Sequence, residues 1–167
     1  MIYRPYTSDD FDTLYALEEV CFDPPFRFGR GSMRHLVSRS NAATWIAEEI
    51  GQMAGFAIVE WTKDEHGTTA YIQTIEVAPK VRGQGIGREL LNRIESSASE
   101  AGAELIWLHV DATNSGAIRL YESQDYLCEG RQENYYPLGR AALTYVKRLD
   151  AVPASSQTTK TRGDDSA

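Results

Sequence analysis

Cysteine is scarce in this sequence, and no histidine cluster accompanies it. Cys21 and Cys128 are the only two cysteines among 167 residues, and they form neither a Cys-x-x-Cys motif nor a disulfide framework. The histidines, His35, His66 and His109, show no metal-ligand spacing to one another or to the cysteines. We therefore expect two reduced thiols without a role, and no metal site.

Long apolar runs and an excess of positive charge are also absent. No run approaches the roughly 20 residues that cross a bilayer, and residues 1–5 lack the layout of a signal peptide. These absences predict a cytoplasmic protein that does not bind a membrane. The formal net charge of −7 repels nucleic acid at long range, so we expect no partner of that class.

The composition is typical of one globular domain. Hydrophobic residues make up 42% of the chain and charged residues 25%, and the length suffices for one core without disulfides or metal. We predict that residues 1–149 form this domain. Residues 150–167 are rich in Ser, Thr and Asp and carry almost no large apolar side chain, which predicts a disordered tail.

Hydrophobic periodicity predicts alternating strands and helices, and therefore an α/β protein. After a strand near residues 2–6, a first helix begins at Thr7 or Ser8 and ends before Pro24. The other predicted helices lie near residues 33–37, from Gly85 to Gly102, and after Asn114. The other predicted strands are 44–49, 53–61, 70–77, 105–110, 126–131 and 142–149, with a polar loop at 63–68.

The turn between strand 70–77 and the long helix carries the strongest functional signal. It reads Arg82-Gly83-Gln84-Gly85-Ile86-Gly87-Arg88. The glycines allow the main chain to approach a ligand closely, and the free N–H groups at the helix start favour a phosphate. The spacing differs from the Gly-x-Gly-x-x-Gly dinucleotide fingerprint, and no Gly-Lys-Ser/Thr sequence is present. We therefore predict an anionic ligand that is neither a dinucleotide nor a nucleoside triphosphate.

This turn, together with Ile75-Glu76-Val77-Ala78-Pro79 before it, resembles the acetyl-coenzyme A pyrophosphate motif of the Gcn5-related N-acetyltransferases. The resemblance covers about residues 1–149. It implies a mixed sheet of about six or seven strands with about four helices, in which two central strands splay apart to hold the coenzyme. It also implies that residues 82–88 bind the pyrophosphate, while Ile75 and Val77 offer main-chain groups to the pantetheine arm.

Within that family, the sequence is most similar to protein N-terminal acetyltransferases, including the bacterial ribosomal-protein alanine acetyltransferases. Residues 108–110 and 114–122 resemble their second core motif, residues 134–137 their substrate-side hairpin, and residues 21–25 their first substrate loop. One departure is Gln124-Asp125-Tyr126, where relatives commonly have Leu-Gly-Phe. The resemblance assigns coenzyme contacts to Asn114, Ala117 and Tyr121, and acceptor contacts to Phe22, Pro24, Tyr135 and Tyr136.

Acyl transfer from a thioester requires a group that takes the proton of the amine and a donor for the departing thiolate. The resemblance implies Tyr121 as the donor and His109, with Tyr71, as the acceptor. Each also has a purely structural interpretation, as a core aromatic or a histidine at a strand end. Glu76 is the alternative base, and regular strand alternation places it on the face opposite to Tyr71.

These features predict an acetyl-coenzyme A-dependent N-acetyltransferase, a monomer or homodimer, that acts on the N-terminal α-amine of a protein or peptide. An α-amine, with a pKa of about 8, is neutral at pH 7 far more often than lysine, at about 10.4. Two alternatives stay open: a small acceptor such as a polyamine or aminoglycoside, whose positive charge suits an acidic protein, and a sensor that binds acetyl-coenzyme A without turnover.

Overall fold

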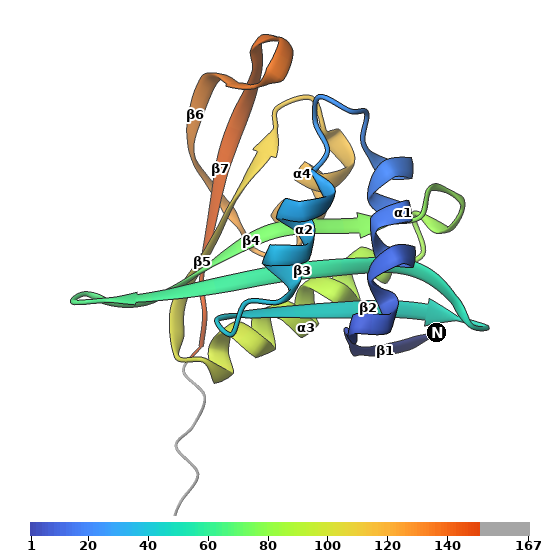
Figure 1. Cartoon of the computed structure of the whole chain (residues 1–167). Helices are drawn as coiled ribbons and strands as arrows, with labels where there is room; N and C mark the ends of the chain where they lie inside the picture. Colours follow the sequence, from blue (N-terminus) through green and yellow to red (C-terminus); the bar gives the residue numbers. More distant parts are fainter. Residues whose placement is uncertain (151–167) are drawn as a thin grey trace, which may run out of the picture.

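The computed structural model describes residues 1–150, so the predicted tail from residue 151 onward lies outside the described part. One seven-stranded sheet, in the order β1-β2-β3-β4-β5-β7-β6, organises the chain. In Figure 1, α1 and α2 cover one face of the sheet and α3 the other. The elements are β1 (Ile2–Pro5), α1 (Phe11–Cys21), α2 (Arg30–Val37), β2 (Ala42–Glu49), β3 (Gln52–Asp64), β4 (Gly67–Val77), α3 (Ile86–Glu100), β5 (Ala103–Asp111), α4 (Ser115–Ser123), β6 (Leu127–Tyr136) and β7 (Arg140–Arg148). The predicted α/β architecture is confirmed.

Each face of the sheet buries its own hydrophobic core. On one face, α3 supplies a stripe with helical spacing, Ile86, Leu90, Leu91, Ile94 and Ala98, that packs with residues of β3, β4 and β5. On the other face, α1 and α2 pack on β2 and β3. α3 begins at Gly85, whose φ of 83° is a conformation that suits glycine. No helix within residues 1–150 is long and apolar enough to span a membrane.

The two central strands separate along their length. β4 and β5 are the one parallel pair among the strands of residues 1–150, and their pairing extends from Thr68 and Ala103 to Tyr71 and Trp107. Both strands continue beyond that point, β4 to Val77 and β5 to Asp111. The predicted splay is therefore present, and it leaves main-chain groups of β4 beyond Tyr71 unpaired on the side of β5.

β4 also contains a β-bulge at Gln73, which the sequence pattern did not reveal. On β3, Ile58 pairs with Thr74. Its neighbour Val59 pairs with Ile72, so Gln73 is an extra residue in the ladder. The Gln73 side chain donates to Glu60 Oε1 at 2.7 Å.

The bulge corrects the predicted alternation of β4. Ile72 and Ile75 both contribute to the core beneath α3, although an uninterrupted strand would point them to opposite faces. The same shift brings Tyr71 and Glu76 to the face of α1, so the expectation that they lie on opposite faces was wrong. One inserted residue exchanges the faces of all positions that follow it.

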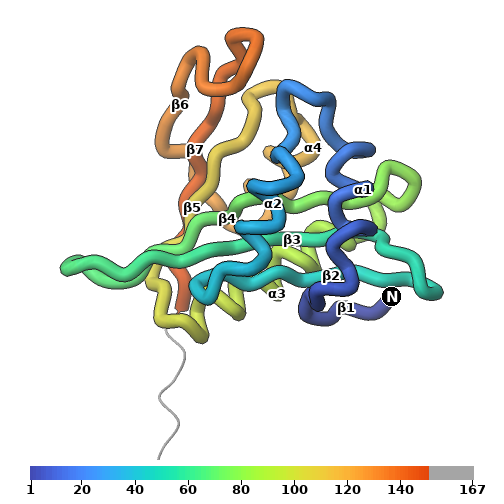
Figure 2. The backbone as a smooth tube through the Cα atoms, in the orientation of Figure 1, coloured from blue at the N-terminus to red at the C-terminus, as the bar shows by residue number. Residues whose placement is uncertain are grey.

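Other differences concern the ends of elements. The predicted loop 63–68 is a two-residue turn, because β3 runs to Asp64 and β4 starts at Gly67. The resulting hairpin projects beyond the rest of the sheet, as Figure 2 shows. α1 starts later than predicted, at Phe11, after a 3₁₀ turn over Ser8–Asp10. β6 continues to Tyr136, past its predicted end at Arg131.

Candidate active site

Two cavities adjoin the region where β4 and β5 separate. One of about 750 Å³ lies between the end of β4, the glycine turn and α4. The other, of about 620 Å³, lies between the loop after α1, the splayed strands and the β6–β7 hairpin. Both are lined by Cys21, Phe22, Ile75, Asn114, Ala117 and Tyr121. The two spaces therefore meet at α4, as a donor site and an acceptor site must for direct transfer.

The larger cavity collects the residues predicted to bind the coenzyme. All of them line it except Gln84. Gly83 and Gly85 adopt φ values of 77° and 83°, which shape the turn before α3. The sequence analysis missed four lining residues of α4, Gly116, Arg119, Leu120 and Ser123. Helical spacing from Asn114 and Ala117 could have indicated them.

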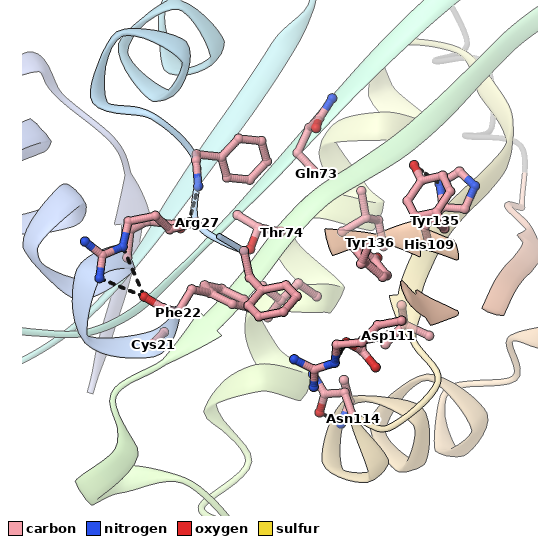
Figure 3. A pocket seen from close by; sticks show the side chains of 18 of the residues that line it. Cys21, Phe22, Arg27, Gln73, Thr74, His109, Asp111, Asn114, Tyr135 and Tyr136 are labelled. Atoms are coloured by element: carbon pink, nitrogen blue, oxygen red, sulfur yellow. Dashed lines mark hydrogen bonds and ion pairs between the residues drawn. The ribbon is translucent and has the colours of Figure 1, made fainter. Parts of the chain in front are cut away.

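The smaller cavity brings together the proposed catalytic and acceptor-binding side chains. Its lining includes six of the predicted residues: His109, Tyr71, Tyr121, Phe22, Tyr135 and Tyr136. Pro24 does not line it. Figure 3 shows His109 and Tyr135 opposite the loop that carries Phe22. Lining residues that the sequence analysis did not assign to the site include Phe26, Phe28, Gln73, Thr74, Asp111 and Arg140. They come from loops and strand ends, whose positions depend on the tertiary fold.

His109 lies within a cluster of aromatic rings. Its Nδ1 is 2.9 Å from the Tyr71 hydroxyl and 3.2 Å from the Tyr135 hydroxyl, and its ring stacks on Tyr135 at a centroid distance of 4.4 Å. Burial lowers the pKa of His109 and raises the pKa of Tyr71. The proton of this pair therefore belongs to Tyr71, whose O–H donates to a neutral imidazole.

Tyr121 stands at the junction of the cavities. It is only 6% exposed and packs against Tyr126, with ring centroids 5.5 Å apart. Burial raises the pKa of Tyr121, so its hydroxyl keeps its proton at neutral pH. A buried phenol that borders both spaces is a suitable proton donor for a leaving group at their junction.

Glu76 lies beside a second buried carboxyl group. It is 3% exposed, and Glu18 of α1 is fully buried beside it. Burial, and then the Glu18 carboxyl, raise the pKa of Glu76. The Oε2 atoms of both residues are buried and have no hydrogen-bond partner within residues 1–150, so a proton on Glu76 spares the pair an uncompensated buried charge. Thr74 Oγ1 also donates to Glu76, at 3.0 Å.

The loop after α1 is held firmly against that helix. Phe28 is bonded on both sides of its main chain: its N–H donates to Glu18 Oε1 at 2.8 Å, and its carbonyl accepts from the Tyr15 hydroxyl at 2.9 Å. Arg27 donates from Nε and Nη2 to the Phe22 carbonyl, as Figure 3 shows. These bonds give one wall of the acceptor cavity a defined shape.

Arg140 connects three segments at the rim of the same cavity. Its Nε is 2.8 Å from Asp111 Oδ2, and its Nη2 donates to Thr113 Oγ1 at 2.9 Å. Its guanidinium also lies 4.5 Å from the centre of the Phe26 ring. Residues 1–150 contain no group of three or more His, Cys, Asp or Glu arranged to hold a metal ion.

Comparison with known proteins gives relatives along most of the chain. The [ribosomal protein bS18]-alanine N-acetyltransferase of Escherichia coli strain K12 is 39% identical over 87 residues, 52% of this chain and 56% of that enzyme, so the match spans about half of its length. The streptothricin acetyltransferase of Streptomyces lavendulae is 35% identical over 130 residues, 73% of this chain and 68% of that enzyme. The N-alpha-acetyltransferase 60 of Xenopus tropicalis is 30% identical over 172 residues, 89% of this chain and 70% of that protein.

Solved structures show the same fold. The Escherichia coli ribosomal-protein-S18-alanine N-acetyltransferase has a TM-score of 0.78 at 24% identity, with 92% of this chain and 96% of that chain covered. NAA60 of Arabidopsis thaliana in complex with acetyl-CoA has a TM-score of 0.79 at 22% identity, with 89% and 98% covered. The model of the acetyltransferase (GNAT) family matches residues 9–126. With this match and the splayed sheet, glycine turn and paired cavities described above, the chain belongs to the acetyltransferase (GNAT) family.

Proposed function

We propose that this protein is an acetyl-coenzyme A-dependent N-acetyltransferase whose acceptor is the N-terminal α-amine of a protein or peptide. The observation that carries the proposal is the meeting of two cavities at Tyr121, with the His109–Tyr71 pair on the acceptor side. A donor thioester and an amine that enter from opposite sides come together at this point. Binding in a fixed orientation is itself a large part of the catalysis of such a transfer.

The larger cavity fits acetyl-coenzyme A, which supplies an activated acetyl thioester when bound. Free N–H groups of the glycine turn and the start of α3 are suited to a diphosphate. Arg82 and Arg88 add positive charge there. The main chain of β4 at Ile75 and Val77, which does not pair with β5, offers hydrogen bonds to an amide-containing arm. A relative of the same fold was solved with acetyl-CoA bound.

The proton route uses the two neutral groups of the acceptor cavity. Tyr71 passes its hydroxyl proton to His109 Nδ1, 2.9 Å away, and takes one from the amine directly or through a water molecule. Tyr121 donates its proton to the thiolate as the C–S bond breaks. Glu76 is the weaker candidate base, because it is buried and its pKa is raised beside Glu18.

The acceptor is inferred from the relatives and from the shape of the site. Two of the relatives named above are an alanine N-acetyltransferase of a ribosomal protein and an N-alpha-acetyltransferase. The acceptor cavity is open and lined by aromatic side chains, including Phe22, Phe26 and Tyr136, which suit an extended peptide end.

One observation favours a different acceptor. The streptothricin acetyltransferase is similar over 73% of this chain. A small cationic amine would also suit a protein with a net charge of −7. An acetyl-coenzyme A sensor without turnover is the third possibility, and it predicts binding without product.

Release of coenzyme A distinguishes these possibilities. The purified protein is supplied with acetyl-coenzyme A and a panel of N-terminal peptides, α-acetylated lysine peptides, polyamines, aminoglycosides and streptothricin. We expect release to depend on peptides with a free α-amine and to vanish when that amine is acetylated beforehand. Release of coenzyme A with small amines alone would identify a small amine as the acceptor. Binding of acetyl-coenzyme A without release of coenzyme A would support a sensor. Failure to bind acetyl-coenzyme A would overturn the proposal.

A further inference from the structure

Arg119 is a cavity residue to which the sequence motifs assign no role. It lies on α4 and lines the 750 Å³ cavity together with Arg82 and Arg88 of the glycine turn. Coenzyme A carries two separate anionic groups, a diphosphate and a phosphomonoester at the 3′ position of its ribose. The amides of the turn, with Arg82 and Arg88, account for the first group only.

The positive charge of these three arginines is uncompensated. None of them forms an ion pair within residues 1–150, although six other arginines do: Arg4, Arg30, Arg39, Arg93, Arg131 and Arg140. Among residues 1–150, the one acidic side chain that lines the cavity is Glu76, which is buried against Glu18. In a protein with a net charge of −7, a concave site with three guanidinium groups outside any ion pair of the described residues is suited to an anion.

The position of Arg119 on α4 separates it from the reaction centre. Asn114, Ala117 and Tyr121 line both cavities, whereas Gly116, Arg119, Leu120 and Ser123 line only the larger one. α4 also lies close to the glycine turn, since a Cβ added at Gly87 would be 3.3 Å from Leu120 Cδ2. Arg119, next to Leu120 on the same helix, therefore lines the larger cavity from α4 and does not line the smaller one.

We propose that Arg119 binds the ribose 3′-phosphate of coenzyme A and makes the protein prefer coenzyme A to its 3′-dephospho form. This inference rests on the proposed function, because it places the coenzyme in this cavity. A phosphomonoester carries about −1.5 to −2 charge at pH 7, and a guanidinium binds two of its oxygens at once. Arg82 serves the other end of the site, since its Nε is held 3.0 Å from the Val77 carbonyl of β4.

Calorimetric titration with coenzyme A and 3′-dephospho-coenzyme A tests the assignment in wild type, Arg119→Gln and Arg131→Gln. Arg131 is the matched control, because it is an exposed arginine of β6 that pairs with Glu133 and does not line the cavity. We expect wild type and Arg131→Gln to bind coenzyme A roughly tenfold tighter than the dephospho form. In Arg119→Gln the ratio of the two dissociation constants, dephospho form over coenzyme A, should fall to about two, because only the binding of coenzyme A becomes weaker.

Three results would overturn the assignment while leaving the proposed function intact. They are equal affinity of wild type for the two ligands, an unchanged ratio in Arg119→Gln, and a loss of affinity by the same factor for both ligands, which would place Arg119 at the diphosphate. If wild type binds neither ligand, the proposed function is wrong and this inference falls with it. Thermal unfolding of Arg119→Gln establishes that the variant is folded, as expected for a change at an exposed position.

Discussion

At the scale of single residues, burial acts in opposite directions on the two groups of the proposed proton transfers. It raises the pKa of Tyr121 and lowers that of His109, because in both cases the charged form is the one that loses solvation. Both groups are therefore neutral at pH 7. Tyr121 holds a proton that it can donate, and the unprotonated Nδ1 of His109 can accept one through Tyr71.

Replacement of Tyr121 by phenylalanine tests its role as donor. We expect kcat to fall about 100-fold or more, since a positioned general acid contributes on that scale. The dissociation constant of acetyl-coenzyme A should change little, because the ring and its packing on Tyr126 are kept. Steady-state kinetics together with equilibrium titration measure both quantities. An unchanged kcat in an active protein would remove Tyr121 from the mechanism.

The dependence of rate on pH tests His109. The base works only when neutral, so kcat/KM for the acceptor should fall as the pH decreases through the pKa of His109. Because that pKa is lowered, the loss of kcat/KM caused by His109 should set in below about pH 6.5. Protonation of the α-amine of the acceptor affects kcat/KM near pH 8. His109→Gln should remove the additional loss below about pH 6.5, leave the titration of the α-amine, and reduce the rate about 100-fold. His35→Gln, at an exposed position of α2, should leave the profile as it is.

At the scale of elements, contacts between segments far apart in the chain shape the site. Glu18 of α1 lies beside Glu76 of β4 and raises its pKa, and Glu18 also accepts a hydrogen bond from the main-chain N–H of Phe28 in the loop after α1. The helix, the strand and the loop are thereby joined around buried carboxyl groups. An uncompensated charge on these buried carboxyl groups is unfavourable, so the packing of the three segments is sensitive to their ionisation.

Glu76→Gln should stabilise the protein at neutral and alkaline pH. The pKa of Glu76 is raised, so the folded state holds a proton that the unfolded state loses above about pH 4.5, and wild-type stability must fall as the pH rises from there. Glutamine keeps a hydrogen bond to Glu18 without this penalty, and we expect a gain of roughly 1 to 3 kcal/mol at pH 8 that shrinks towards pH 5. Urea unfolding at both pH values measures it.

The same variant separates the two candidate bases. If Tyr71 and His109 accept the proton, Glu76→Gln should retain most of the wild-type rate. A loss comparable to that of His109→Gln would assign the base to Glu76. Glu133→Gln, which removes an exposed carboxylate of β6, controls for the change in net charge.

The turn after α4 offers a second test at this scale. Asp125 stands where relatives commonly have glycine, and it adopts a φ of 67°. The turn nevertheless closes, with Tyr126 N donating to the Tyr121 carbonyl at 3.1 Å. Asp125→Gly should raise stability by roughly 0.5 to 1 kcal/mol and Tm by about 2 °C, without loss of activity. Asp125→Ala should not raise stability, because alanine lacks the backbone freedom of glycine. Equal gains in stability for the two variants would indicate that removing the charge is the cause.

At the scale of the whole molecule, charge is distributed unevenly. The net charge is −7, yet the larger cavity is lined by three arginines that form no ion pair within residues 1–150. The two cavities also lie between elements from both halves of the chain, α1 and β4 on one side and β5, α4 and the β6–β7 hairpin on the other. A ligand held between them should therefore stabilise the fold as a unit.

Acetyl-coenzyme A should raise the unfolding temperature of the whole domain. At 100 times its dissociation constant the expected stabilisation is about 2.7 kcal/mol, provided that only the folded state binds. Acetate and free pantetheine, which lack the phosphates, should have little effect at the same concentration. Differential scanning calorimetry measures the shift, and no shift at saturating acetyl-coenzyme A would contradict the proposed binding site.

The sequence alone was sufficient to predict the α/β class, most elements and the glycine turn before α3. These features are local: helical periodicity in residues 86–98, strand runs of apolar residues, and glycines placed directly before a helix. The motif around Asn114 and Tyr121 is likewise contained within one segment. The predicted roles of the site residues remain predictions, although nearly all of these residues line one of the two cavities.

Only the tertiary structure decided which residues meet. The bulge at Gln73 depends on the pairing of β4 with β3, so no pattern within β4 could show that Tyr71 and Glu76 share a face. The raised pKa of Glu76 beside Glu18 depends on contacts between separate elements, and the charge of Arg119 depends on the lack of an ion pair within residues 1–150. Local periodicity reports how a segment is buried, whereas the environment of an ionisable group is set by whatever the fold brings next to it.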